Sequence, residues 1–283
     1  MAQRNVGIIA RLSFREAARR RVLLGASVLS ALFLAVYGAG LWFIHEDLSR
    51  SGQAANVAVA VAAYNLLQQL GLYATYLLSA LLTVLVAVSS LAGEIESETL
   101  QSIAARPIRR WELLCGKWLG LAAVLSLYLG ILAGGVLIVS RVITRYSLPH
   151  IARGLALMEL DMLVILSVSL AVSTRLPALG GGVCVLGAFA TGFLGGWMEQ
   201  IGAGMGNSRT VAIGVVSSLI MPTEALWRRA AYEMRSVLAD TLSQDSLFYR
   251  ALSVPSTTMI VYGLLYALAA MVIAIRLFDR RDL

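Results

Sequence analysis

The chain has 283 residues, of which 59% are apolar and 14% charged, and its mean hydropathy is +0.79. A globule of this size cannot bury so much apolar surface, so the composition argues against a soluble enzyme and indicates a lipid bilayer as the solvent. The net charge of +7 comes almost wholly from arginines beside apolar segments, which points to a membrane surface and not to nucleic acid. We therefore predict an all-α integral membrane protein.

The first element is a basic segment, expected to form a helix over about residues 4–19. At 100° per residue its arginines fall on one face and its apolar side chains on the other. This pattern predicts a helix that lies on the membrane surface. The alternative is a positive flank that only orients the first span.

Six segments are then long enough to cross about 30 Å of hydrocarbon. They are expected at about 22–44, 70–92, 113–139, 151–174, 178–198 and 257–278. The arginine distribution places both termini in the cytoplasm. No internal repeat or linker interrupts the chain, so 1–283 is predicted to be one multi-pass domain.

Between the second and third spans lies the densest charge of the chain, "GEIESETLQSIAARPIRRWELLCGK", Gly93 to Lys117. Acidic residues at its start and basic residues near its end suit the dipole of a short helix, and Pro107 stops that helix. We expect a helix over about 95–105, and Lys117 should snorkel toward the interface. The alternative is a solvated loop that satisfies only the charge rule for cytoplasmic segments. The candidate contact residues are Glu94, Glu96, Glu98, Thr99, Leu100, Ile103, Pro107, Arg109 and Arg110.

The fourth span encloses two carboxylates, Glu159 and Asp161. Side chains two positions apart point about 200° away from each other on a helix, which argues against a catalytic acid and base pair. We expect both to face protein or water, with one of them pairing with Arg153 or Arg145. Proton coupling is a second interpretation.

An outer segment follows the fifth span. Residues 210–221 are apolar but too short to cross, so they form either a re-entrant piece or an extension of the fifth span. Pro222 then opens a predicted amphipathic helix over about 222–241, with Glu224 and Arg228 paired four residues apart. We expect this helix on the outer surface, as interfacial packing or as a lid over an exit path.

Small-residue pairs spaced four apart are candidates for close helix packing, either within the chain or between two copies. They are Gly116 and Gly120, Gly130 and Gly134, and Gly192 and Gly196.

The charged stretch resembles the signature of permease subunits of type-2 ABC exporters, a group that includes nitrous-oxide-reductase maturation permeases. The matching residues are Gly93, Glu94, Glu96, Thr99, Leu100, Pro107, Arg109 or Arg110, Glu112, Gly116 and Lys117. The basic N-terminal segment is similar to the elbow helix of the group, and "RLFDRRDL" to its C-terminal ending. One departure is Ser97-Glu98, where many relatives have a glycine before the threonine.

This resemblance implies a non-catalytic permease that binds no cofactor and no metal of its own. The chain contains no G-x-x-x-x-G-K-[ST] cradle, so ATP and Mg²⁺ belong to a separate ATPase subunit, which would receive the 95–105 coupling helix. It also implies a second copy of the permease or a homologous one, export, and the bacterial cytoplasmic membrane. The alternatives are a secondary transporter or channel, or an intramembrane enzyme, although the sequence contains none of the usual membrane protease motifs.

Overall fold

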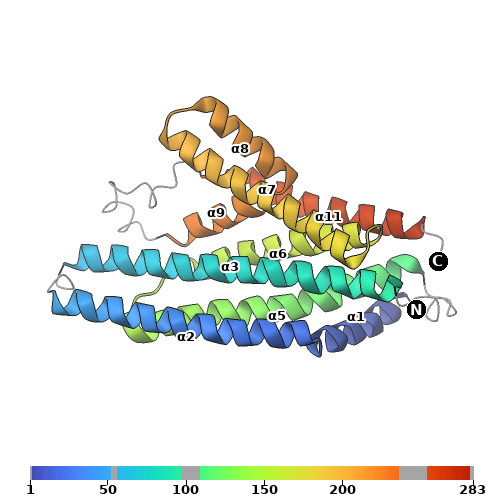
Figure 1. The fold of residues 1–283 in the computed structure, drawn as a ribbon, viewed down its shortest axis with the longest axis horizontal. Coiled ribbons are helices and arrows are strands. Elements are labelled where there is room, and N and C mark those ends of the chain that lie inside the picture. Colours follow the sequence, from blue (N-terminus) through green and yellow to red (C-terminus); the bar gives the residue numbers. More distant parts are fainter. Residues whose placement is uncertain (1, 52–55, 97–108, 236–253, 281–283) are drawn as a thin grey trace.

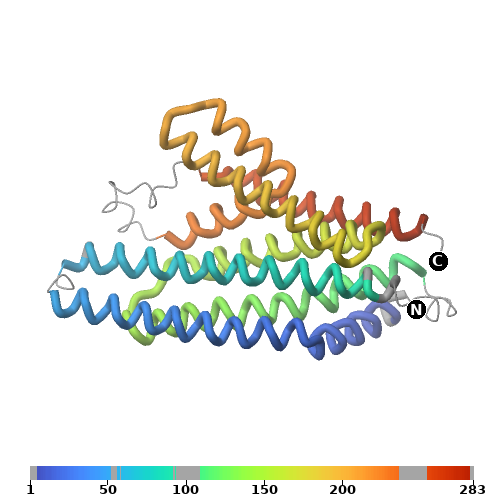
Figure 2. Tube along the Cα trace, in the orientation of Figure 1, coloured from blue at the N-terminus to red at the C-terminus, as the bar shows by residue number. Residues whose placement is uncertain are grey.

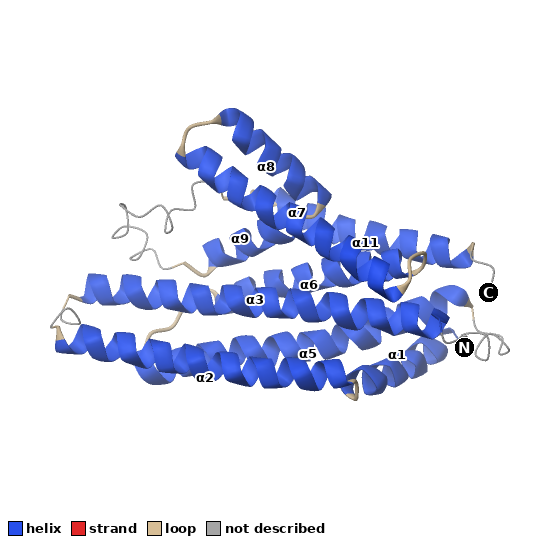
Figure 3. Ribbon diagram, viewed as in Figure 1, coloured by secondary structure: helices blue, strands red, loops and turns tan. Residues whose placement is uncertain are grey.

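The computed structural model describes residues 2–51, 56–96, 109–235 and 254–280, and within these ranges all regular structure is helical (Figure 3). Figure 1 labels the helices in chain order. They are α1 (Ala2–Ala18), α2 (Arg21–Arg50), α3 (Val57–Glu96), α5 (Arg110–Thr144), α6 (Ile151–Ser173), α7 (Ala178–Gly204), α8 (Ser208–Ile220), α9 (Thr223–Glu233) and α11 (Thr258–Asp279).

Six of these helices, α2, α3, α5, α6, α7 and α11, are long and apolar enough to cross a membrane, which confirms the predicted all-α membrane fold. The second of them begins at Val57 and not near residue 70. The prediction began too late because polar side chains in the first turns of α3 looked like positions outside the membrane. In the structure these side chains are buried inside the protein. Gln68 is 1% exposed, and Asn65 donates a hydrogen bond of 3.0 Å to the Tyr146 hydroxyl.

Long helices run side by side along the bundle, with α2, α3 and α5 nearly parallel to its long axis (Figure 1). α3 and α6 form the centre of the bundle. In their most apolar 18-residue stretches, 67% and 61% of the residues are buried, against 17% in α11. α1 and the last turns of α11 lie at the same end of the bundle, where α3 ends and α5 begins (Figure 2). An even number of spans requires this arrangement of the two ends.

The α7–α8 hairpin projects from the bundle, and the chain then turns sharply into α9 (Figure 1). The axes of α8 and α9 differ by 103°, with the break at Pro222. Proline biases the preceding residue away from helical angles, and Met221 is indeed extended, with φ −142° and ψ 103°. The apolar segment before Pro222 therefore forms a helix of its own, bent sharply away from the next one.

The predicted outer amphipathic helix is wrong in its position. α9 lies inside the protein against α6 and α7 and is buried on nearly all sides. Its buried residues are Thr223, Glu224, Ala225, Leu226, Trp227, Arg228 and Ala230. The separation of apolar and charged side chains onto different sides of this helix suggested a surface, but its charged side chains are paired or enclosed within the bundle. Residues 236–241 of the predicted helix lie outside the described part of the chain.

Candidate functional site

A polar junction joins four helices at the end of the bundle where α3 ends and α5 begins. α1 packs directly on α5 there, over Gly116 and Gly120. A Cβ atom at Gly120 would lie 2.5 Å from the Ala10 carbonyl oxygen, and one at Gly116 would lie 2.7 Å from the Ile9 Cβ. Only glycine permits this approach. The predicted apolar face of α1 therefore contacts protein, with Ala17 only 2% exposed.

Side chains in the first turn of α5 form hydrogen bonds with α1 and with the end of α11. Glu112 is 4% exposed and accepts a hydrogen bond of 3.1 Å from the Asn5 side chain of α1. Arg110 donates to the carbonyl oxygens of Phe278 and Asp279, at 3.0 and 3.2 Å, at the end of α11. A cation near the carboxyl end of a helix is also favoured by the helix dipole. Both contacts tie chain segments far apart in sequence to the start of α5.

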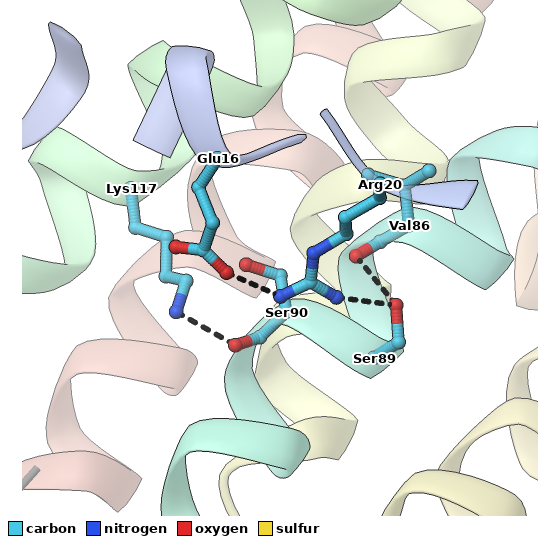
Figure 4. A network of polar contacts seen from close by, with 6 residues as sticks. All are labelled: Glu16, Arg20, Val86, Ser89, Ser90 and Lys117. Carbon is cyan, nitrogen blue, oxygen red and sulfur yellow. Dashed lines mark hydrogen bonds and ion pairs between the residues drawn. The ribbon is translucent and has the colours of Figure 1, made fainter. Parts of the chain in front are cut away.

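Lys117 links α5 to α3 (Figure 4). Its side chain is 2% exposed, and its ammonium donates a hydrogen bond of 2.8 Å to the Ser90 carbonyl oxygen. The expectation that Lys117 would snorkel to the interface is therefore wrong. A carbonyl of the neighbouring helix gives the ammonium a partner within the protein, so the side chain need not reach water.

Arg20, between α1 and α2, forms the second link to α3 (Figure 4). One guanidinium nitrogen donates to the Ser89 hydroxyl at 2.8 Å, and the other contacts the Glu16 carboxylate at 2.6 Å. The adjacent residues Ser89 and Ser90 thus receive one cation each, Ser89 from the turn between α1 and α2 and Ser90 from α5. The last turns of α3 are fixed to both α1 and α5.

This arrangement is mechanical in character. The contacts described are hydrogen bonds and an ion pair, some between two side chains and some from a side chain to a backbone carbonyl. None of them pairs a nucleophile with a general base. No group of three metal-ligating side chains occurs among the described residues. What the junction provides is a rigid connection between the helix that precedes residues 97–108 and the helix that follows them.

The predicted contact residues lie around this junction only in part. Glu94 and Glu96 belong to the last turn of α3, which runs on without a break at Gly93, and not to a separate helix. Arg109 is exposed just before α5, and Arg110 contacts α11. The other predicted contact residues and most of the 95–105 helix lie outside the described residues; these are Glu98, Thr99, Leu100, Ile103 and Pro107.

The two intramembrane carboxylates point to different helices, in agreement with their spacing. Glu159 accepts a hydrogen bond of 2.5 Å from Ser126 of α5, whereas Asp161 is fully buried. The expected pairing of one of them with Arg153 is wrong. Arg153 lies 3.7 Å from Glu233, because α9 packs beside the start of α6.

The other glycine pairs differ from each other. Gly192 and Gly196 contact the segment around Pro222: a Cβ atom at Gly192 would lie 2.5 Å from the Met221 carbonyl oxygen, and Gly196 lies against the Glu224 side chain. Nothing in the described chain approaches within 4 Å of a Cβ atom at Gly130 or Gly134. Gly192 and Gly196 therefore pack against other parts of the same chain.

Sequence reasoning missed the main ion pair of the bundle. Arg228 of α9 contacts Glu199 of α7 at 2.6 Å, and both side chains are less than 10% exposed. The predicted Glu224–Arg228 pair was based on helical spacing alone. The one available signal was that Glu199 ends the fifth apolar run, where an unpaired acid would be costly.

Six apolar helices joined in this way define a multi-pass membrane protein. Residues 8–283 match the model of the ABC-2 family transporter proteins, and the chain belongs to that family. Comparison with curated protein sequences gave no match. The chain is thus an ABC-type permease and a non-catalytic membrane subunit for transport, and such a permease works with an ABC ATPase.

Proposed function

We propose that the chain is the membrane half of an exporter driven by a separate ATPase subunit, which contacts it through residues 95–105. The family match supports the ABC-type permease. The observation that carries the coupling proposal is the pair of contacts to adjacent residues of α3, a buried one from Lys117 of α5 and a partly buried one from Arg20. Because α3 and α5 are joined there, a force applied between them would move both spans together.

In this proposal the ATPase grips the 95–105 segment on the cytoplasmic side of the bacterial inner membrane. Closure of two ATPase subunits around ATP would tilt α3 and α5 and shift the pathway from inward to outward exposure. Both chain termini lie on the same cytoplasmic side. A second permease, identical or homologous, completes the pathway, and the finer similarity to nitrous-oxide-reductase maturation permeases stays a prediction.

The test is copurification with the ATPase encoded by a neighbouring reading frame, followed by ATPase assays in lipid nanodiscs. The double variant Glu94→Arg with Glu98→Arg should insert normally but lose stimulation of the ATPase, because it reverses the charge of the contact segment. The matched control is Glu46→Arg with Asp47→Arg in the last turns of α2, at the opposite end of the bundle (Figure 1). Wild-type stimulation in the first double variant would refute the coupling proposal.

A further inference from the structure

A second polar cluster lies where α3, α6, α7 and α9 meet, among the membrane-spanning helices. It holds two carboxyl side chains, Asp161 of α6 and Glu224 of α9, which are 0% and 5% exposed. Three aromatic side chains accompany them: Tyr73 and Tyr76 of α3 and Trp227 of α9. The Tyr76 hydroxyl lies within electrostatic range of both carboxyls, and the two carboxyls lie within range of each other.

Three of the four carboxyl oxygens in this acidic aromatic cluster lack a hydrogen-bond partner in the described part of the chain. Neither oxygen of Asp161 has a hydrogen-bond partner in the described part of the chain, and the same holds for Glu224 Oε2 and the Thr223 hydroxyl. Arg228 is close enough to attract the Glu224 carboxyl electrostatically, but its ion pair is with Glu199. Glu199 and Glu224 thus share one arginine, and Asp161 has another acid, Glu224, as a charged neighbour. A buried carboxylate without a partner is costly in an apolar interior, so such a group either holds a proton or is available to bind a cation.

The aromatic side chains indicate which kind of cation fits. The rings of Trp227, Tyr73 and Tyr76 form a triangle, with centroids 5.2 Å (Tyr73–Trp227), 5.4 Å (Tyr76–Trp227) and 5.8 Å (Tyr73–Tyr76) apart, and Phe189 of α7 lies 6.0 Å from Tyr76. Ring faces attract organic ammonium groups, and several rings around a carboxylate form a suitable site for them. Metal ions instead require several oxygen, nitrogen or sulfur ligands, and no group of three such side chains of His, Cys, Asp or Glu exists in the described ranges.

We propose that this cluster binds the ammonium group of an organic cation, with Asp161 and Glu224 supplying the negative charge and Tyr76 and Trp227 the ring faces. If the cluster is the site that binds the transported molecule, this assignment rests on the transport function proposed above. The site is closed in this structure. Entry of a cation would require movement of α9, which carries Glu224 and Trp227 and follows the 103° bend at Pro222.

The test measures binding to the purified chain alone, in lipid nanodiscs and without any ATPase, by equilibrium dialysis. The probes are phenyltrimethylammonium and its uncharged isostere tert-butylbenzene, each corrected for uptake by empty nanodiscs. The wild-type protein should bind the ammonium at least about ten-fold more tightly than the isostere, as expected for a charge-specific site. Asp161→Asn and Glu224→Gln should each lower the ammonium affinity by about ten-fold or more.

Two further variants separate recognition from general structural damage. Glu159→Gln changes another acid of α6, one that contacts Ser126 of α5, and should bind as the wild type does. Trp227→Phe should keep most of the affinity because a ring face remains, whereas Trp227→Leu should lose it.

Equal binding of the charged and uncharged probes by the wild type would overturn the proposal. So would unchanged ammonium affinity in both Asp161→Asn and Glu224→Gln. If one of these variants does not fold, two measurements still test the proposal. They are the difference between the two probes in the wild type and the ammonium affinity of the other variant. Because no ATPase is present, a failure here is distinct from a failure of the coupling proposal.

Discussion

The junction at the end of α3 and the acidic aromatic cluster are both polar and both buried, but they differ in how their groups are paired. In the junction, Lys117 and Glu112 each have a protein partner, at 2.8 and 3.1 Å. In the cluster, Asp161 is 0% exposed and neither of its oxygens has a partner in the described chain. A paired network holds helices in one arrangement, whereas an unpaired buried carboxyl favours any state or ligand that supplies a partner. The junction therefore holds its helices in one arrangement, whereas the acidic aromatic cluster favours a change of state or the binding of a ligand.

The largest expected effect comes from the ion pair beside the cluster. Arg228→Met should lower the free energy of unfolding by about 3–5 kcal/mol, because it leaves the buried Glu199 carboxylate without its 2.6 Å partner. Thermal unfolding in detergent, followed by tryptophan fluorescence, measures this loss. The control Arg50→Met breaks the exposed Arg50–Glu46 pair and should cost about 0–1 kcal/mol. Similar losses in the two variants would contradict the assignment of a buried pair.

The second prediction concerns the close contact between α1 and α5. Gly120→Leu should destabilise the protein by about 1–3 kcal/mol, since its side chain would collide with the α1 backbone at Ala10. Gly130→Leu, in the same helix, is the matched control, because a Cβ atom there meets nothing within 4 Å in the described chain. The same unfolding assay checks both. A loss in the control alone would mean that α1 does not pack as described.

The third prediction compares two acids of α6 and expects opposite signs. Asp161→Leu should raise the free energy of unfolding by about 1–3 kcal/mol, because it removes a buried polar group that has no hydrogen-bond partner among the described residues. Glu159→Leu should lower it by about 0.5–1.5 kcal/mol through loss of the hydrogen bond from Ser126. Thermal midpoints of the two variants, measured side by side, give the signs. Destabilisation by Asp161→Leu as large as that by Glu159→Leu would remove the contrast between satisfied and unsatisfied groups.

The smallest effect is expected at Arg20. Arg20→Ala removes the contact with Ser89 and an ion pair whose side chains are 22% and 48% exposed, so the loss should be about 0.5–1 kcal/mol. Arg50→Ala removes a similarly spaced pair with Glu46 and should cost less, since the described contacts give Arg50 no link to another helix. The difference between the two midpoints measures the link from Arg20 to α3. No difference would show that the Ser89 contact contributes nothing.

The sequence predicted the spans because their apolar length is a local property. The same holds for the break at Pro222, which follows from the chemistry of one residue. The start of α3 was not predictable in this way. Gln68 and Asn65 look like positions outside the membrane until the groups that enclose them are known.

The site was less predictable than the fold, because its contacts join residues far apart in the chain. Helical spacing pairs Glu224 with Arg228, yet Glu199 from another helix takes the ion pair. Lys117 looked like an interfacial cation because nothing in its local sequence places the Ser90 carbonyl beside it. The sequence marked the charged residues of interest, and the packing of α3, α5 and α9 decided their partners.

α3 connects the two regions in a single rod. Its 40 residues correspond to roughly 60 Å of helix, about twice the thickness of the hydrocarbon layer. Ser90, held by Lys117, and Tyr76, beside the carboxyls, lie on this rod about 20 Å apart along its axis. A tilt of only about 5° carries one end of such a rod through roughly 5 Å. A small tilt at the end of α3 that Lys117 holds would therefore displace its other end by about the rise of one helical turn.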